Sequence, residues 1–315
     1  MSYHKLLSGI FACALFIGCK QTTEHTSKEL AMAEIPEPSL DEELIKPTSK
    51  EFNDYWYTGE AEISSYELKQ ARYGEVRDGK AVLVFVTEPF SVEQQVKSDY
   101  PNTEESLSVL KLNATKNFNT GIYPYSIMSS NFYPVSNDQH SVKVTMSMQE
   151  WCGHVYAQIN NRDAFEVMSR SYFQSEGDQN FTLNKTSLEN DLWQQIRIDP
   201  NSLLVGEFEM VPSLEFSRLK HIPIKAYKAQ AKKADLGELT RYALVYPELK
   251  RSLQVTYRTK FPHIIESWEE TYTSGFGAKA KQMTSTAKRI ETIKSPYWQK
   301  NSNADLSLRQ TLGLE

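Results

Sequence analysis

Apolar and polar residues alternate along most of the chain beyond residue 60, as expected of strands that bury one face. The segment 61–68 shows this alternation, and 81–86 is an apolar run with the length of a buried strand. The Asp-Gly pair within Arg77–Lys80 separates these runs and predicts a hairpin turn. Further strands are expected at 107–115, 123–129, 141–150, 155–160, 164–174, 203–211, 222–231, 242–246, 253–259, 264–273 and 281–293.

In two stretches the apolar residues recur with a helical period instead. Thr48 and Glu51 have the spacing of a capping box, so a short helix is expected to begin at Thr48. The same spacing recurs at Thr186 and Glu189, and Asp199-Pro200 ends this second helix because a residue before proline disfavours the helical conformation. The apolar stripe of the second helix consists of Leu188, Leu192, Trp193 and Ile196.

Together these elements predict a mainly β protein. It would be one large, curved antiparallel sheet or half-barrel with one or two short helices, LolA/LolB-like in outline. No internal repeat and no Gly- or Ser-rich linker divides the chain, so 48–315 is expected to be a single domain. Trp151, Trp193 and Trp268 should pack between the concave face and the second helix, with Trp151 the first candidate for a surface position. The alternative places these indoles in an open concavity that contacts a lipid or glycan.

The first eighteen residues have the features of an export signal. Lys5 gives the start a positive charge, and 6–18 is a run of small and apolar residues too short to span a bilayer. The run ends in Leu15-Phe16-Ile17-Gly18-Cys19, which resembles a bacterial lipobox and predicts that Cys19 is lipidated. Since Lys20 is not the Asp that retains lipoproteins at the inner membrane, the outer membrane is favoured. The alternative is an ordinary secretory signal that is cut near Ala14.

Composition and cysteine usage agree with an exported, lipid-attached domain. Hydrophobic residues make up 40% and charged residues 24% of the chain, and the mean hydropathy of −0.52 argues against a polytopic membrane protein. Cys13 would leave with the signal and Cys19 would be acylated, so Cys152 would remain alone without a disulfide partner. No second apolar run is long enough to cross a membrane, so the lipid is the expected membrane attachment.

Residues 19–47 are expected to be an acidic, flexible tether. The stretch 20–51 contains three prolines and no Phe, Tyr or Trp, and its eight acidic and four basic residues give −4 of the total charge of −5. Low hydrophobicity with net charge is typical of segments that do not fold. The tether would hold the domain away from the membrane.

Three segments carry a resemblance to a known family. They are Asn119–Ser126, Gln149–Tyr156 and Phe261–Glu270, and they resemble segments of uncharacterised envelope lipoproteins of the Bacteroidetes. Members of that family are often labelled "septum formation inhibitor Maf", whereas Maf proteins are cytoplasmic nucleotide pyrophosphatases with a Ser-x-x-Arg-Arg type motif. That motif is absent from this chain. The resemblance therefore implies an envelope lipoprotein and no particular activity.

Catalytic chemistry has one candidate in the sequence. Cys152 and His154 would share one face of a strand, close enough for the histidine to activate the thiol, with Asn160 or Asp163 orienting the histidine. The alternative is that Cys152 is a small buried hydrophobic residue. The other histidines have no metal-binding spacing, so neither a metal nor another cofactor is expected.

A basic stretch carries the candidates for ligand binding. Residues 218–260 contain eleven Lys or Arg against three acidic residues, with aromatic residues between them. Such a surface would bind an anionic lipid, a glycan or an acidic protein partner, and the envelope address argues against nucleic acid. The alternative is that lysines simply occupy the outward positions of exposed strands. The candidate residues within this stretch are Tyr227, Lys228, Tyr242, Arg251 and Tyr257, and Trp151 is a further candidate outside it.

Two functions are therefore expected from the sequence. The first is an outer-membrane-anchored lipoprotein that binds a lipid, a glycan or an envelope partner without catalysis. The alternative is a hydrolase or transferase that uses Cys152 and His154 on cell-envelope material.

Overall fold

The computed structural model describes residues 48–99, 106–136, 140–275 and 277–315, all of which lie in one compact unit. The signal and Cys19, as well as the tether, lie outside the described residues. Among the residues that are described, no helix is long and apolar enough to cross a membrane.

The fold is one large, curved sheet of sixteen strands, as the alternation predicts. Its first half contains β1 Ala61–Arg72, β2 Glu75–Ser91, β3 Val96–Lys97, β4 Ser106–Thr120, β5 Tyr123–Pro134, β6 Lys143–Glu150, β7 Gly153–Asn161 and β8 Phe165–Arg170. The second half contains β9 Gln179–Leu183, β10 Ser187–Leu188, β11 Gly206–Val211, β12 Tyr227–Asp235, β13 Leu239–Tyr246, β14 Arg251–Arg258, β15 Ile265–Ser274 and β16 Lys281–Ser295.

Strands that follow one another in the chain are neighbours almost everywhere in the sheet. The order is β10-β11-β12-β13-β14-β15-β16-β1-β2-β4-β5-β6-β7-β8-β9, with the short β3 beside β2. Because β16 pairs with β1, the strands form an up-and-down barrel that stays open between β9 and β10. Every pairing is antiparallel except the short parallel contact of β10 with β11.

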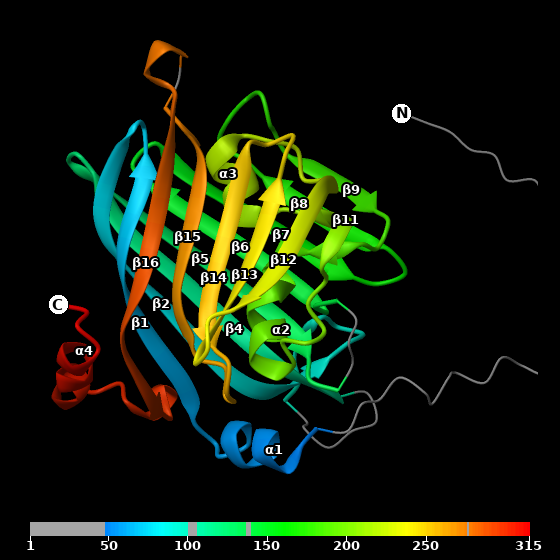
Figure 1. The fold of residues 1–315 in the computed structure, drawn as a ribbon, viewed down its shortest axis with the longest axis vertical. Helices are drawn as coiled ribbons and strands as arrows, with labels where there is room; N and C mark the ends of the chain where they lie inside the picture. The colour runs from blue at the N-terminus through cyan, green and yellow to red at the C-terminus, as the bar shows by residue number, and fades with distance from the viewer. Residues whose placement is uncertain (1–47, 100–105, 137–139, 276) are drawn as a thin grey trace, which may run out of the picture. The chain divides into compact units, whose positions relative to one another are not determined.

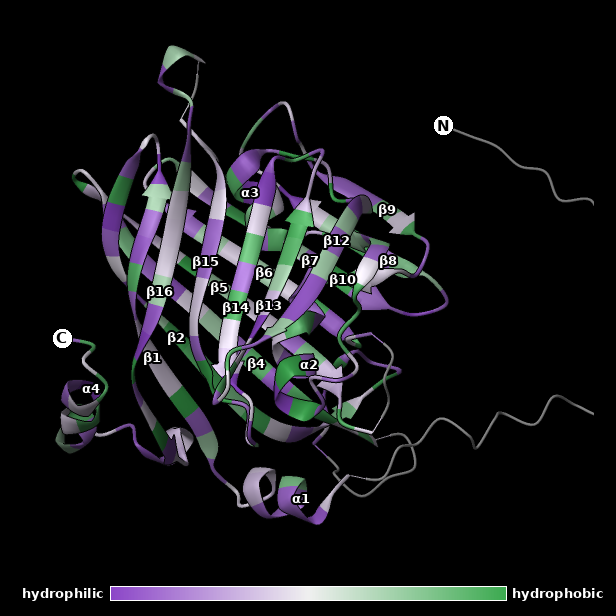
Figure 2. Cartoon of the chain, viewed as in Figure 1, coloured by the Kyte–Doolittle hydropathy of each residue, from purple (hydrophilic) through white to green (hydrophobic). Residues whose placement is uncertain are grey.

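The sheet curls so that its two halves share one hydrophobic core. Figure 1 shows β12–β16 in front of β4–β8, and one cluster of buried residues combines side chains from both halves, such as Met146, Leu244 and Leu253. Figure 2 shows hydrophobic and hydrophilic residues following each other along single strands. In β12, for example, buried and exposed residues alternate from Tyr227 to Lys232, which is the period that places one face inside.

Residues 184–226, called the inner segment below, lie between β9 and β12 in sequence. They contain β10 and β11 and two short helices, α2 Leu192–Ile198 and α3 Leu214–Lys220. Each helix buries several side chains, including the Ile196 side chain in α2 and the Phe216 side chain in α3. The inner segment therefore contributes buried side chains to the core, as additional strands would in a closed barrel.

Both predicted capping boxes are wrong in detail. Helix α1 spans Lys50–Trp56, and its N-cap is Ser49, whose hydroxyl accepts a hydrogen bond from the Phe52 amide at 3.0 Å. The second helix begins only at Leu192. Thr186 donates its hydroxyl to the Glu209 carbonyl instead, and the Glu189 carboxylate pairs with a buried arginine described below, so neither residue caps a helix.

The predicted turn at Arg77–Lys80 is also wrong, because these residues lie inside β2. The hairpin turns instead at Tyr73 and Gly74, both with positive φ (55° and 79°), the conformation of a type I′ turn. Gly79 is needed for another reason: a Cβ there would lie 2.4 Å from the Asn117 carbonyl oxygen of β4. The glycine marks a close approach of two strands.

The tryptophans divide between the core and the surface. Trp268 is 3% exposed, and its ring lies 5.3 Å from that of Trp193 in an edge-to-face contact between β15 and α2. This confirms the prediction that Trp193 and Trp268 pack where the second helix meets the sheet. Trp151 is 68% exposed, in the turn between β6 and β7.

We expect Trp268→Ala to lower the free energy of unfolding by about 3–5 kcal/mol, because it removes a buried aromatic ring from the core. Trp151→Ala should change the free energy of unfolding by less than about 0.5 kcal/mol, as surface substitutions usually do. Urea denaturation of the full chain, followed by circular dichroism, measures both. Equal losses for the two variants would contradict this division.

Candidate ligand-binding cleft

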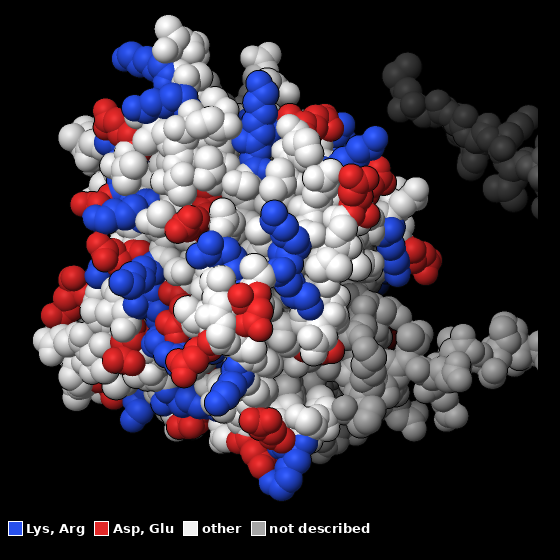
Figure 3. Space-filling view, viewed as in Figure 1, with Lys and Arg blue, Asp and Glu red and all other residues white. Residues whose placement is uncertain are grey.

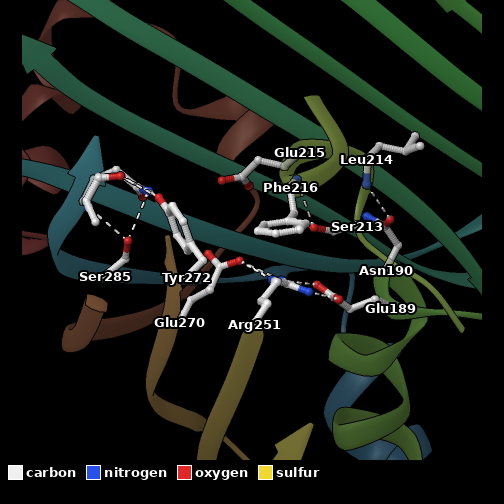
Figure 4. A network of polar contacts seen from close by, with 12 residues as sticks. Glu189, Asn190, Ser213, Leu214, Glu215, Phe216, Arg251, Glu270, Tyr272 and Ser285 are labelled. Carbon is white, nitrogen blue, oxygen red and sulfur yellow. Dashed lines mark hydrogen bonds and ion pairs between the residues drawn. The ribbon is translucent and has the colours of Figure 1, made fainter. Parts of the chain in front are cut away.

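A buried arginine is held between two carboxylates inside the sheet (Figure 4). Arg251 of β14 donates from Nε to Glu270 Oε1 at 2.7 Å and from Nη2 to Glu189 Oε1 at 2.7 Å. Its guanidinium lies 4.0 Å from the centre of the Phe216 ring. Burial alone would raise the pKa of Glu189, but the charge of Arg251 holds it below its usual range.

Two further ion pairs join the inner segment to the sheet. Arg197 of α2 contacts both carboxylate oxygens of Glu62 in β1, at 2.5 and 2.6 Å, and both side chains are at most 1% exposed. Glu215 of α3 accepts a hydrogen bond from Lys116 of β4 at 2.8 Å. The charges inside the barrel thus have partners, and they connect elements that are distant in sequence.

The interior leaves little space for a ligand. The cavity beside Arg251, Lys116 and Trp268 has a volume of about 60 Å³, room for a few water molecules. Pockets for drug-sized ligands typically measure ~300–1,000 Å³. A ligand of that size does not fit this cavity, whose ion-paired side chains lie among the residues of the shared hydrophobic core.

The predicted basic and aromatic surface does not form. Tyr227, Tyr242, Arg251 and Tyr257 are all at most 4% exposed, so the aromatic residues and Arg251 belong to the core, whereas Lys228 points outward. The period of two along β12–β14 places neighbouring residues on opposite faces. Figure 3 shows basic side chains interspersed with acidic ones on the displayed face, so the charge excess of 218–260 does not form a uniform patch there.

The predicted pairing of Cys152 with His154 is not supported by the local geometry. Cys152 lies in the turn between β6 and β7 and is exposed, so it is neither on a strand beside His154 nor a buried hydrophobic residue. A hydrogen bond with Glu150 and that residue's charge raise the pKa of the thiol. Asn160 and Asp163 lie towards the opposite end of β7, about 20 Å away at the rise of a strand.

A cleft of about 250 Å³ opens at the end of the sheet where Cys152 lies. Its wall includes residues of β6 to β9, the connection 171–178, both ends of α3 and residues 222–224. Helix α3 follows an N-cap at Ser213 and ends at His221, which has the left-handed conformation with φ 54°. This arrangement places the last turn of α3 opposite the connection that follows β8.

Charged groups from both sides meet in the cleft. His221 Nδ1 lies 2.5 Å from Glu176 Oε1 and 3.2 Å from Arg218 Nη1. The Ser171 hydroxyl donates to the other carboxylate oxygen of Glu176. Burial would raise the pKa of Glu176, but Ser171, His221 and Arg218 hold it below its usual range. Glu176 and His221 are 45 residues apart in sequence, so no short sequence motif could indicate that they lie together.

Two polar groups of the cleft lack a partner among the described residues. Ser217 is 2% exposed, and its hydroxyl makes no hydrogen bond. The Nε atom of Arg218 is buried and likewise without an acceptor. Leaving a buried polar group unpaired costs about 1–3 kcal/mol, and such groups beside a cavity are ready to bind a polar ligand.

Aromatic residues continue the cleft outward, and we call Tyr123, Trp151, Tyr172 and Phe173 the aromatic rim. Trp151 and Tyr172 are exposed, and the other two are half-buried. The rings of Tyr123 and Trp151 lie 6.3 Å apart, and those of Tyr172 and Phe173 lie 5.3 Å apart. Tyr172, which is 60% exposed, covers Gly153 so closely that a Cβ there would lie 2.8 Å from its ring. Phe173 in turn contacts His221 at 5.0 Å, so the rim leads into the cleft.

Comparison with known proteins adds little about function. No known protein family matches the chain, and no curated protein matches it. A crystal structure of a beta-barrel-like protein of a domain of unknown function from Brucella abortus is similar over 75% of this chain and 98% of its own length. The TM-score is 0.43 and the identity 7%. The function must therefore be inferred from this chain's own residues.

We expect Cys152 to react with iodoacetamide at pH 7 more slowly than glutathione does, because its raised pKa leaves little thiolate. Glu150→Gln should speed up the reaction, since it removes the charge that opposes the thiolate. Mass spectrometry of the peptide that contains Cys152 follows the rate. Alkylation faster than that of glutathione would indicate an activated thiol and restore the enzyme hypothesis.

Proposed function

We propose that this chain is a lipid-anchored protein of the cell envelope that binds a ligand through the aromatic rim and the adjoining cleft, without catalysis. The observation that carries this proposal is the continuity between exposed rings and a cleft that contains unpaired polar groups. Exposed aromatic side chains grouped at one place mark interaction sites in soluble domains.

The proposed location in the cell envelope rests on the sequence. The apolar run 6–18 and the lipobox-like residues that end in Cys19 support export and lipidation. Lys20 favours the outer membrane as the destination. An anchor of two or more acyl chains holds a protein stably on a bilayer, and the acidic tether would let the domain reach ligands near that surface.

The local geometry favours binding over catalysis. The thiol of Cys152 has a raised pKa, the reverse of what a nucleophile needs. In the cleft, the Ser171 hydroxyl donates to Glu176 and not to the His221 ring, so the histidine is not positioned to take the hydroxyl proton. The same groups are well suited to hold a polar ligand in place.

The position of the site favours a ligand bound at the end of the barrel over a lipid carried inside it. The interior cavity of about 60 Å³ is lined by paired charges, whereas the cleft at the rim has about 250 Å³. Moving an acyl chain into the interior would require the inner segment to leave and its ion pairs to separate. Breaking one buried pair typically costs about 3–5 kcal/mol.

We expect Cys19→Ser to move the protein out of the membrane fraction or leave the signal uncleaved, because the acyl acceptor is gone. Cys152→Ser is the matched control and should fractionate like the wild type. Cell fractionation and incorporation of labelled palmitate measure the two effects. A Cys19→Ser protein that stays in the membrane with a normal mature mass would exclude the lipidation proposal.

The binding proposal predicts that removing both exposed rings, in a Trp151→Ala/Tyr172→Ala variant, weakens ligand binding by more than about tenfold. Retention of the full chain, solubilised in mild detergent, is measured on immobilised envelope polysaccharide, lipopolysaccharide, peptidoglycan and phospholipid. Trp298→Ala is the control, because Trp298 is 46% exposed and follows β16 near the opposite end of the sheet. Unchanged retention of the double variant on every material would rule out the rim as the binding surface.

A further inference from the structure

Positive charges gather where the cleft meets the mouth of the barrel. Arg72, at the end of β1, donates from Nη1 to the Leu219 carbonyl of α3 at 2.9 Å. Lys220 of the same helix donates to the Thr273 carbonyl at 2.6 Å. Arg218 belongs to the same helix and lies close enough to Arg72 to feel its charge, so three basic side chains from β1 and α3 share one end of the barrel.

These cations influence one another. Burial lowers the pKa of Arg218, and the charge of Arg72 lowers it further against the opposing effect of Glu176. Burial and then Arg72 likewise lower the pKa of Lys220. The carboxylates that act on Arg218 are Glu176, 3.8 Å away, and Glu150. Three cations face two carboxylates, so the mouth attracts an anion.

Arg218 offers this anion a defined docking geometry. Its Nη1 faces His221 and Glu176, while none of the described residues accepts a hydrogen bond from Nε or Nη2. The Nε–Nη2 edge of a guanidinium is the side that binds a carboxylate or phosphate with two hydrogen bonds. In this same protein the Nε and Nη2 atoms of Arg251 both lie 2.7 Å from one carboxylate oxygen, Glu270 Oε1. Both oxygens of Glu176 already have partners in Ser171 and His221.

The surroundings of Arg218 indicate which kind of molecule carries the anion. The Arg218 side chain is 11% exposed, so a flat membrane surface would not reach it, whereas a single anionic group on a narrow ligand would. The Trp151 and Tyr172 rings beside the cleft offer flat apolar faces, against which the C–H face of a sugar ring packs. The Ser217 hydroxyl is available for a hydroxyl group of the ligand.

We infer that the cleft binds an acidic saccharide, whose carboxylate or phosphate docks on Arg218 while its sugar rings lie on the aromatic rim. Arg72 and Lys220 contribute through their charge, and Arg218 makes the direct contact. This inference rests on the proposed binding function and specifies its ligand class.

Calorimetry on the detergent-solubilised full chain tests the inference with a matched pair of probes. The acidic probe is a hexasaccharide of alternating glucuronic acid and N-acetylglucosamine, and the neutral probe is the same hexasaccharide with its carboxylates reduced to alcohols. We expect the acidic probe to bind at least about tenfold more tightly, since a charge-assisted bidentate contact is among the strongest polar interactions. Equal affinity for the two probes would overturn the inference.

Variants separate a direct contact from general charge attraction. Arg218→Gln should weaken binding of the acidic probe at least about tenfold and leave the neutral probe unaffected, and Arg218→Lys should fall in between because it keeps the charge without the fork. Arg258→Gln is the control: it removes the same charge from a side chain that is 50% exposed and pairs with Glu266 away from the cleft. If Arg258→Gln weakens binding as much as Arg218→Gln, the attraction is general and the docking on Arg218 is refuted.

Two further outcomes separate the inference from the proposed function. Melting temperatures of the variants establish that they are folded, and the comparison of the two probes on the wild type does not depend on any variant. Binding to anionic phospholipid vesicles without binding to the acidic hexasaccharide would replace the saccharide by a membrane surface. If neither probe binds while the rim still retains an envelope polymer, the binding function stands and the acidic ligand class is wrong.

Discussion

Three ion pairs, two of them buried and the third partly buried, hold the inner segment against the sheet, and the rest of the architecture depends on them. Glu189, Arg197 and Glu215, from three successive parts of that segment, pair with β14, β1 and β4. Such pairs add little net stability compared with apolar packing, but separating one is costly. We therefore interpret them as a specificity device, because each charge finds its partner in only one position of the segment. That position in turn places α3 against β6 and forms the cleft.

The architecture could be predicted from the sequence because it follows from a local signal. Alternation of apolar and polar residues identified nearly every strand and therefore the curved sheet. Local signals failed where a distant strand decided the outcome. Position 79 needs a glycine because β4 passes close to it. The Glu189 carboxylate pairs with Arg251, 62 residues away, so it does not cap a helix. Neither β4 nor Arg251 falls within the short stretch of sequence from which a turn or a helix start is predicted.

The candidate site was largely beyond the reach of the sequence for the same reason. Of the residues expected to bind a ligand, only Trp151 lies at the rim, because its exposure follows from its position in a turn. Arg218 was within the basic stretch, but nothing distinguished it from the outward lysines. Its importance arises from Glu176 and His221, which come from separate segments, and from an edge left without acceptors. The composition of a charged stretch shows how many charges exist, whereas the fold decides which of them lack partners.

The pairing of β1 with β16 has a consequence for how the chain can fold. The first strand and the last strand of the sheet lie side by side, with partners such as Ala61 and Ser295 more than two hundred residues apart. A chain that emerges with its N-terminus first must keep the edge of β1 unpaired until almost its whole length is free. Folding with such remote contacts is slow, and an open strand edge invites pairing with other chains. Protection of that edge during synthesis or transport is therefore a requirement built into the topology.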